Sequence, residues 1–260
     1  MEEKRMMKVT VDGAEHAYPC GTPFRTIAAD FQSRYPCDIL LVNRDGKLCE
    51  LHKALDRDCS LKMVTAQDKP GIQTYERSAV FLLLKAFYDV AGRENVERIS
   101  VEYSLSSALF FLARGAFTLN QALLERVEAR MRELSALALP IEKKTLNTDD
   151  AIDLFRQARL LHKAQLLSFR INSHVNVYSL DGFVDYFYGY MAPDTGYIRC
   201  FGLELFENGF VLRLPTQKDP NHLGEFRPSH KVFQELYQST LRSEALCASN
   251  VAELNTTIAQ

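Results

Sequence analysis

Two aspartate-glycine pairs, Asp12-Gly13 and Asp45-Gly46, each separate short runs that are rich in β-branched and aliphatic residues. A type I′ hairpin turn needs positive φ at both central residues, and such pairs adopt it easily. The pairs therefore predict two tight hairpins within the first 50 residues. A further apolar run, "CSLKMVTA", predicts one more strand after them.

The stretch "CGTPFRTIAADFQSRYP" between the hairpins predicts a helix. Its apolar residues Phe24, Ile27 and Phe31 recur at helical spacing, with Thr22 as the expected cap and Pro23 at the first helical position. The element order is then strand, strand, helix, strand, strand, strand. That is the order of a β-grasp (ubiquitin-like) sheet.

The remaining chain mixes helices and strands. Residues 74–92 are apolar on nearly all sides and predict a buried helix, and a capping box formed by Thr118 and Gln121 predicts the start of a long amphipathic one. Asn208-Gly209 predicts another hairpin turn. Strands are expected at 98–105, 108–115, 174–180, 183–190, 196–206 and 209–215. The fold class is therefore α+β, with helices packed on an antiparallel sheet.

Charge and cysteine usage exclude several classes of protein. The chain has 260 residues, a formal net charge of −2 and a pI near 6.3, so it has no global attraction to nucleic acid or to an anionic membrane. Its six cysteines form no CxxC pair, which is typical of free thiols in a reducing cytoplasm. The N-terminus lacks the apolar core of a signal peptide, and no run is long enough to span a bilayer. We expect a cytoplasmic protein without a membrane partner.

The N-terminal segments "VTVDGAEHAYPCGTPFRTIA", "LLVNRDGKLCELHKAL" and "LKMVTAQD" carry a family resemblance. With the turns at Pro19 to Thr22 and Asp45 to Lys47, residues 1–68 resemble the TGS domain of threonyl-tRNA synthetases and some GTPases. The resemblance implies a small ligand- or RNA-docking module, although an adaptor without a dedicated site is the simpler interpretation.

Residues 69–243 resemble the editing domain that threonyl-tRNA synthetases share with alanyl-type deacylases, through "RSAVFLLLKA" and "VYSLDGFVDYFYGYMAPDTGYIRCFGL". In that family two histidines, a cysteine and a third histidine converge for zinc binding or water activation. The resemblance places Arg77, Phe81, Phe187 and Met191 at these positions. Arginine stays protonated, phenylalanine has no lone pair and one methionine is too weak a ligand for zinc. We therefore expect the editing chemistry to be lost, with no catalytic residue and no metal site.

The same positions and their aromatic neighbours define a candidate ligand-binding groove. Its residues are Arg77, Phe81, Tyr186, Phe187, Tyr188, Tyr190, Met191 and Asp194. In the simpler interpretation these side chains repack a vacated cavity. In the alternative, a concave site remains, where Arg77 meets an anion and a tyrosine stacks on a base.

Taken together, the two regions resemble the N-terminal part of a bacterial nucleoside kinase group of the uridine kinase and phosphoribulokinase family. The stretches "ERSAVFLLLKAFYDVAG", "LPIEKKTLNTDDAIDLF" and "NVYSLDGFVDYFYGYMAPDTGY" carry this resemblance. It implies a downstream kinase domain of the same chain that holds ATP and Mg²⁺. No G-x-x-x-x-G-K-[ST] motif occurs here, so we expect no cofactor in these residues. Residues 244–260, with a helix from about Ser249, are expected to be a linker toward that domain.

The leading hypothesis is thus a non-catalytic accessory or regulatory region of a uridine kinase-like enzyme, with a nucleotide or RNA as a possible ligand. The alternative is a stand-alone tRNA-, RNA- or nucleotide-binding module derived from a synthetase editing domain. A residual deacylase with an unrecognised base is a third hypothesis.

Overall fold

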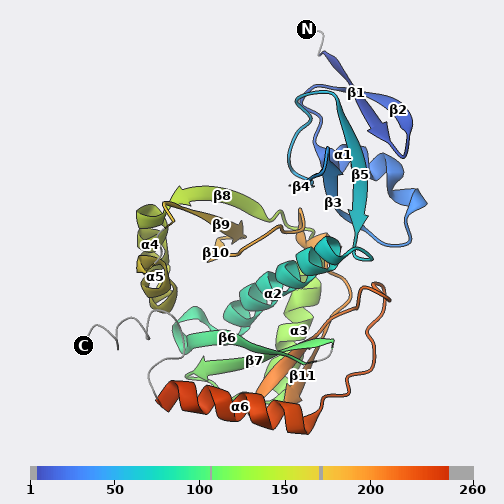
Figure 1. Ribbon diagram of the computed structural model, residues 1–260. Helices are drawn as coiled ribbons and strands as arrows, with labels where there is room; N and C mark the ends of the chain where they lie inside the picture. Colours follow the sequence, from blue (N-terminus) through green and yellow to red (C-terminus); the bar gives the residue numbers. More distant parts are fainter. Residues whose placement is uncertain (1–4, 106, 170–171, 246–260) are drawn as a thin grey trace. The chain divides into compact units, whose positions relative to one another are not determined.

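The computed structural model describes residues 5–105, 107–169 and 172–245 (Figure 1). The chain is α+β, as predicted, and forms two compact units. The first unit comprises 1–102, 107–141 and 189–225, and the second comprises 103–106, 142–188 and 226–260. The linker helix expected from about Ser249 lies outside the described residues.

Residues 6–65 of the first unit form the predicted β-grasp sheet, which we call the β-grasp region. Its strand order is β2-β1-β5-β3-β4, with β1 and β5 parallel and the other pairs antiparallel. Both predicted hairpins are present, and φ is positive at Asp12, Gly13, Asp45 and Gly46. The elements are β1 (Met6–Val11), β2 (Ala14–Pro19), α1 (Phe24–Phe31), η1 (Gln32–Arg34), β3 (Ile39–Arg44), β4 (Lys47–Glu50) and β5 (Cys59–Thr65).

Helix α1 covers this sheet with the face that its sequence spacing predicts. Phe24, Ile27, Ala28 and Phe31 are buried against the strands. The predicted cap is wrong, because Pro23 occupies the N-cap position and no side chain caps the helix. The Thr22 hydroxyl instead donates to the Pro19 carbonyl oxygen at 2.7 Å, which closes the turn before the helix.

The rest of the first unit is built on α2 (Lys69–Ala91) and α3 (Gln121–Ala136), which lie side by side (Figure 1). Helix α2 is buried on several faces, as predicted, but begins five residues earlier than expected, with Pro70 in its first turn. The N-cap of α3 is Asn120, whose side-chain oxygen accepts a hydrogen bond from the Leu123 amide at 2.9 Å. This asparagine cap replaces the predicted capping box of Thr118 and Gln121.

A four-stranded sheet of order β11-β12-β7-β6 completes this unit. Its strands are β6 (Val96–Leu105), β7 (Ala108–Gly115), β11 (Gly202–Phe206) and β12 (Gly209–Arg213), and η2 (Arg93–Asn95) precedes β6. The β11-β12 hairpin is present, but Glu207 and Asn208 form its turn, one residue earlier than predicted. Gly209 belongs to the strand, where a Cβ atom would lie 2.2 Å from the Phe111 carbonyl oxygen.

The second unit contains a three-stranded antiparallel sheet of order β10-β9-β8. Its strands are β8 (Glu142–Asn147), β9 (His174–Leu180) and β10 (Phe183–Tyr186), and its helices are α4 (Thr148–Gln157), α5 (Leu161–Ser168) and α6 (His230–Ala245). Helix α4 opens with Asp149 and Asp150, as expected at a helix N-terminus. Helix α6 was not predicted; the ring of its Phe233 meets that of Tyr103 with centroids 6.1 Å apart.

Two predicted strands are shorter than expected by four or more residues. The strand expected over 183–190 ends at Tyr186, and the strand expected over 196–206 begins at Gly202. Between them lie Gly189, with φ of 114°, and the short helix η3 (Thr195–Tyr197). The left-handed backbone at Gly189 and the capped turn at Asp194 both interrupt an extended conformation.

Within the described residues, no helix combines the length and the apolar character needed to cross a membrane. The five cysteines in this part of the chain are free thiols: Cys20, Cys37, Cys49, Cys59 and Cys200.

Candidate functional site

The segment from Gly189 to Cys200 contains the turn that resembles the deacylase motif. Side chains of α2 form hydrogen bonds with the main chain at the start of this segment. Arg77 donates from Nε to the Tyr190 carbonyl oxygen at 3.0 Å and from Nη2 to the Thr74 hydroxyl at 3.3 Å. A Cβ atom at Gly189 would lie 2.8 Å from Cζ of Arg77. The guanidinium therefore packs directly against the main chain, at a position whose positive φ favours glycine.

The next residues are fixed by two buried polar side chains. The Met191 amide donates to Oε1 of Glu50 at 3.1 Å, and the Ala192 amide donates to the Ser78 hydroxyl at 2.8 Å. Met191 is 2% exposed and Phe81 is completely buried. Two of the four positions that the deacylase resemblance assigns to catalysis are thus filled by buried apolar side chains.

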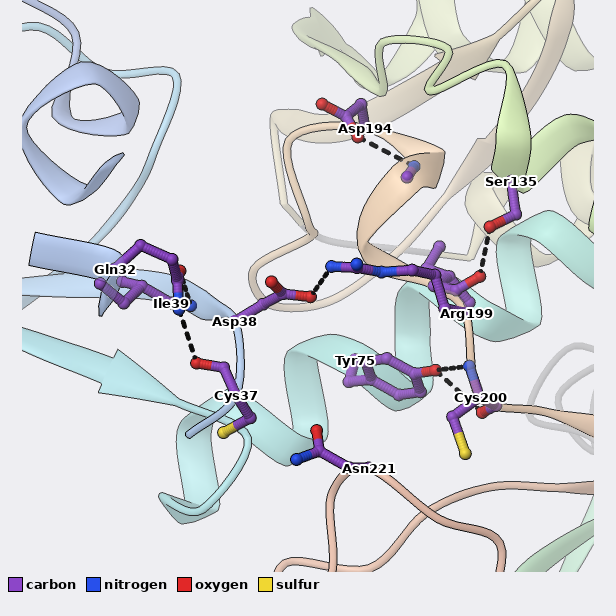
Figure 2. Close-up of polar contacts among 12 residues, drawn as sticks. Gln32, Cys37, Asp38, Ile39, Tyr75, Ser135, Asp194, Arg199, Cys200 and Asn221 are labelled. Atoms are coloured by element: carbon purple, nitrogen blue, oxygen red, sulfur yellow. Dashed lines mark hydrogen bonds and ion pairs between the residues drawn. The ribbon is translucent and has the colours of Figure 1, made fainter. Parts of the chain in front are cut away.

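The turn itself is locked by Asp194 and Thr195, which are both buried. Asp194 accepts from the Gly196 amide at 2.9 Å (Figure 2). It also forms an ion pair with Nη2 of Arg25 at 2.7 Å. The Thr195 hydroxyl donates to the Leu134 carbonyl oxygen and accepts from the Leu139 amide. Asp194 is therefore committed to structural contacts.

Beyond the turn, Arg199 and Cys200 border a cavity of about 330 Å³. The Tyr75 hydroxyl donates to the Cys200 carbonyl oxygen at 2.8 Å and accepts from the Cys200 amide at 2.9 Å (Figure 2). Arg199 forms an ion pair with Asp38 of the β-grasp region, and Ser135 donates to the Ile198 carbonyl oxygen. The lining also includes Gln32, Tyr35, Pro36, Cys37, Leu40, Ala66, Tyr197, Pro220 and Asn221.

Cys200 lines this cavity with a free thiol. Burial raises the pKa of its thiol, and the nearby Asp219 carboxylate raises it further. A thiol with a raised pKa is protonated at neutral pH and reacts slowly. The cavity lining contains no histidine that could act as its base. The raised pKa and the lining residues therefore do not activate the Cys200 thiol as a nucleophile.

The tyrosines of the first unit predict a loss of stability in alkali. Burial raises the pKa of Tyr75 and of Tyr197, and burial together with a hydrogen bond to Asp30 raises the pKa of Tyr18 to about 12. Because the folded chain keeps protons that the unfolded chain releases above about pH 10, this stabilisation is complete below pH 10 and is lost as the pH rises toward 12.

We expect the free energy of unfolding to fall between about pH 10 and about pH 12, and to fall less steeply in Tyr75→Phe. Denaturant unfolding at each pH measures it, with Tyr188→Phe, which alters a tyrosine that is 61% exposed, as the control. If the free energy of unfolding fell with pH at the same slope in the wild type, Tyr75→Phe and Tyr188→Phe, the alkaline loss of stability could not be assigned to Tyr75. Tyrosinate absorbance is an independent readout, since the chain has no tryptophan.

The residues of the predicted groove divide between the two units. Arg77, Phe81, Tyr190, Met191 and Asp194 lie in the first unit, whereas Tyr186, Phe187 and Tyr188 lie in the second. The Tyr186 ring meets those of Phe155 and Tyr188 edge-on, and the Phe187 ring meets that of Tyr178. The groove as a whole stays a prediction. Across the described ranges, no cluster of three or more histidine, cysteine or acidic side chains could hold a metal ion.

Sequence reasoning missed Glu50, Tyr75 and Ser78, whose side chains bind the main chain of the candidate segment. Thr74 and Ser78 are polar residues one helical turn apart in an otherwise apolar helix, and this was the one available signal. Glu50 and Met191 are 141 residues apart, so no local pattern could have paired them.

Comparison with known proteins points to one class of enzyme. The chain is 31% identical over 165 residues to the threonine-tRNA ligase of Methylococcus capsulatus, an alignment that covers 61% of this chain and 25% of that protein. It is 27% identical over 203 residues to the threonine-tRNA ligase of Thermotoga neapolitana, covering 76% and 30%. The chain therefore contains a threonyl-tRNA synthetase-like region. It spans between a quarter and a third of the length of these curated relatives. No family model matches the chain.

Proposed function

We propose that this chain is a non-catalytic, ligand-binding accessory region that keeps the fold of a threonyl-tRNA synthetase N-terminal part without its editing chemistry. Residues 1–68 would be a TGS domain and residues 69–243 a degenerate editing domain. One observation carries the proposal: Arg77, Phe81, Phe187 and Met191 occupy the positions where the deacylase family has its histidines and cysteine. The burial of Phe81 and Met191, and the bonding of Arg77 to the main chain, support it.

The finer proposal is that this region belongs to a uridine kinase-like nucleoside kinase of the cytoplasm. Its basis is the resemblance of the three sequence stretches quoted above. The partner would be a kinase domain of the same protein, in which ATP and Mg²⁺ bind at a P-loop. If the gene encodes a G-x-x-x-x-G-K-[ST] motif after residue 260, the kinase proposal gains direct support. If it does not, the kinase proposal fails.

A second candidate function is a stand-alone module that binds tRNA, another RNA or a nucleotide. The similarity to threonine-tRNA ligases over 61% to 76% of the chain favours a tRNA-related role. Under both candidate functions, the chain does not hydrolyse aminoacyl-tRNA.

We expect the purified chain to hydrolyse tRNA charged with threonine, serine or alanine no faster than buffer does, because no residue at the four positions can activate water. Release of the radiolabelled amino acid measures this, with an active editing deacylase as the positive control. Turnover that persists through purification and disappears in Arg77→Ala would contradict the proposal and revive a deacylase function.

A further inference from the structure

A basic hollow lies in the β-grasp region, where β3 ends, β4 begins and the segment after β4 folds back. Its volume is about 440 Å³. Four cationic side chains line it beside a single acidic one and a thiol: Arg44, Lys47, Lys53, Arg57, Asp56 and Cys49. The whole chain has a net charge of −2, so this is a local concentration of positive charge on an acidic protein.

Arg44 is the most deeply placed of these cations, with a side chain only 12% exposed. Its Nη2 pairs with Asp56, and its guanidinium lies 5.9 Å from the centre of the Phe24 ring. Its Nε is buried and has no hydrogen-bond partner in the part of the chain that the structure describes. A buried donor without an acceptor is unfavourable, and it leaves part of the hydrogen-bonding capacity of the Arg44 guanidinium unused beside the hollow.

The two lysines are exposed and lie near this unmatched donor. Lys47 pairs directly with Arg44 across the β3-β4 ladder, so both side chains project from the same face of the sheet. Neither Lys47 nor Lys53 forms an ion pair with any described residue. Nη2 of Arg57 lies 3.8 Å from Oδ2 of Asp45, and at this distance the carboxylate compensates the positive charge of Arg57 only weakly.

We propose that this hollow binds a phosphate group, carried by a nucleotide or by the backbone of an RNA. Arg44 supplies a guanidinium in the lining, and Lys47 and Lys53 supply exposed positive charges that suit a phosphate with several oxygens. The volume falls within the range of small-molecule sites. This inference deepens the proposed ligand-binding function, because it names the place and the chemistry of recognition.

Asp56 and an arriving phosphate would compete for Arg44, and the effect of Asp56 on phosphate affinity can be measured. The hydrogen bond from Arg44 lowers the pKa of this exposed carboxyl group, so it is ionised at neutral pH and repels an arriving phosphate. Asp56→Asn keeps an acceptor for Arg44 but removes the negative charge. It should therefore tighten phosphate binding.

The experiment titrates the full 260-residue chain with tripolyphosphate, ATP and a short single-stranded RNA, by calorimetry and fluorescence anisotropy, at low and at moderate salt. We expect Lys47→Glu/Lys53→Glu to weaken binding at least about tenfold, and Asp56→Asn to strengthen it about two- to fivefold. Added salt should weaken all phosphate binding.

Lys62→Glu is the matched control. Lys62 follows the buried Leu61 in β5, so it projects from the opposite face of the same sheet and should leave affinity unchanged. Circular dichroism checks that each variant is folded. Binding of RNA alone, lost in the double variant, would support the site and assign the phosphate to nucleic acid.

Absence of binding to all three probes, or equal affinity in the wild type and the double variant, would overturn the proposal. The aminoacyl-tRNA hydrolysis assay measures a different property. A failure here would thus be distinguishable from a failure of the proposed loss of editing.

Discussion

Phe81→His is expected to lower the free energy of unfolding by about 3 kcal/mol and to leave the chain unable to hydrolyse aminoacyl-tRNA. The substitution returns a histidine to one of the positions where the resembling deacylases have it. Phe81 is completely buried in α2, a helix in which Leu82, Leu83 and Phe87 are completely buried as well. An imidazole there loses apolar contacts and places two polar nitrogens where water does not reach.

Chemical denaturation followed by helical circular dichroism measures the loss of stability in Phe81→His. Phe81→Leu is the matched control, and should cost about 1 kcal/mol because it stays apolar and only shrinks the side chain. A fully stable Phe81→His that also hydrolyses charged tRNA would show that the editing centre is dormant rather than filled.

Gly71→Ala is expected to destabilise the first unit by at least about 3 kcal/mol. Alanine usually improves an α-helix by roughly 1 kcal/mol over glycine, so the sign here is decided by packing. A Cβ atom at Gly71 would lie 1.8 Å from the Thr65 carbonyl oxygen and 2.5 Å from the Thr65 carbonyl carbon. These are backbone atoms at the end of β5, and they cannot move without shifting the strand or the helix.

Gly224→Ala provides the comparison, because a Cβ atom at Gly224 would have no neighbour within 4 Å. Its effect should stay within about 0.5 kcal/mol. The two unfolding midpoints in denaturant measure the difference. Equal stability of the two variants would mean that the start of α2 can move away from β5 at little cost.

The β-grasp region was predictable because its signals are local. The pairs Asp12-Gly13 and Asp45-Gly46 have the positive φ angles that their turns require, and the apolar face of α1 packs as its spacing indicates. The helix caps were less predictable. Thr22 and Thr118 are both acceptable caps, yet Pro23 and Asn120 occupy the N-cap positions.

The candidate segment was only partly predictable. The alternation of apolar residues in "FVDYFYGY" indicates a longer strand than the four residues that pair. The positive φ of Gly189 takes the chain out of the extended conformation, and Arg77 binds the Tyr190 carbonyl oxygen from another element. Alternation in a sequence cannot report either feature. The turn at Asp194 was recognised, but its ion pair with Arg25 was not.

The sequence by itself determined the α+β class, the two N-terminal hairpins, the amphipathic helices and the residue types at the four positions that the resemblance to deacylases singles out. These properties depend on residue identity and on neighbours a few positions apart. Only the tertiary structure decided that Phe81 and Met191 are buried and that the Tyr75 hydroxyl forms hydrogen bonds with the main chain of Cys200. It also decided that Arg44 lines a basic hollow and that its Nε has no hydrogen-bond partner among the described residues. Burial and hydrogen-bond pairing depend on residues far apart in the chain, and these meet only when the whole fold has formed.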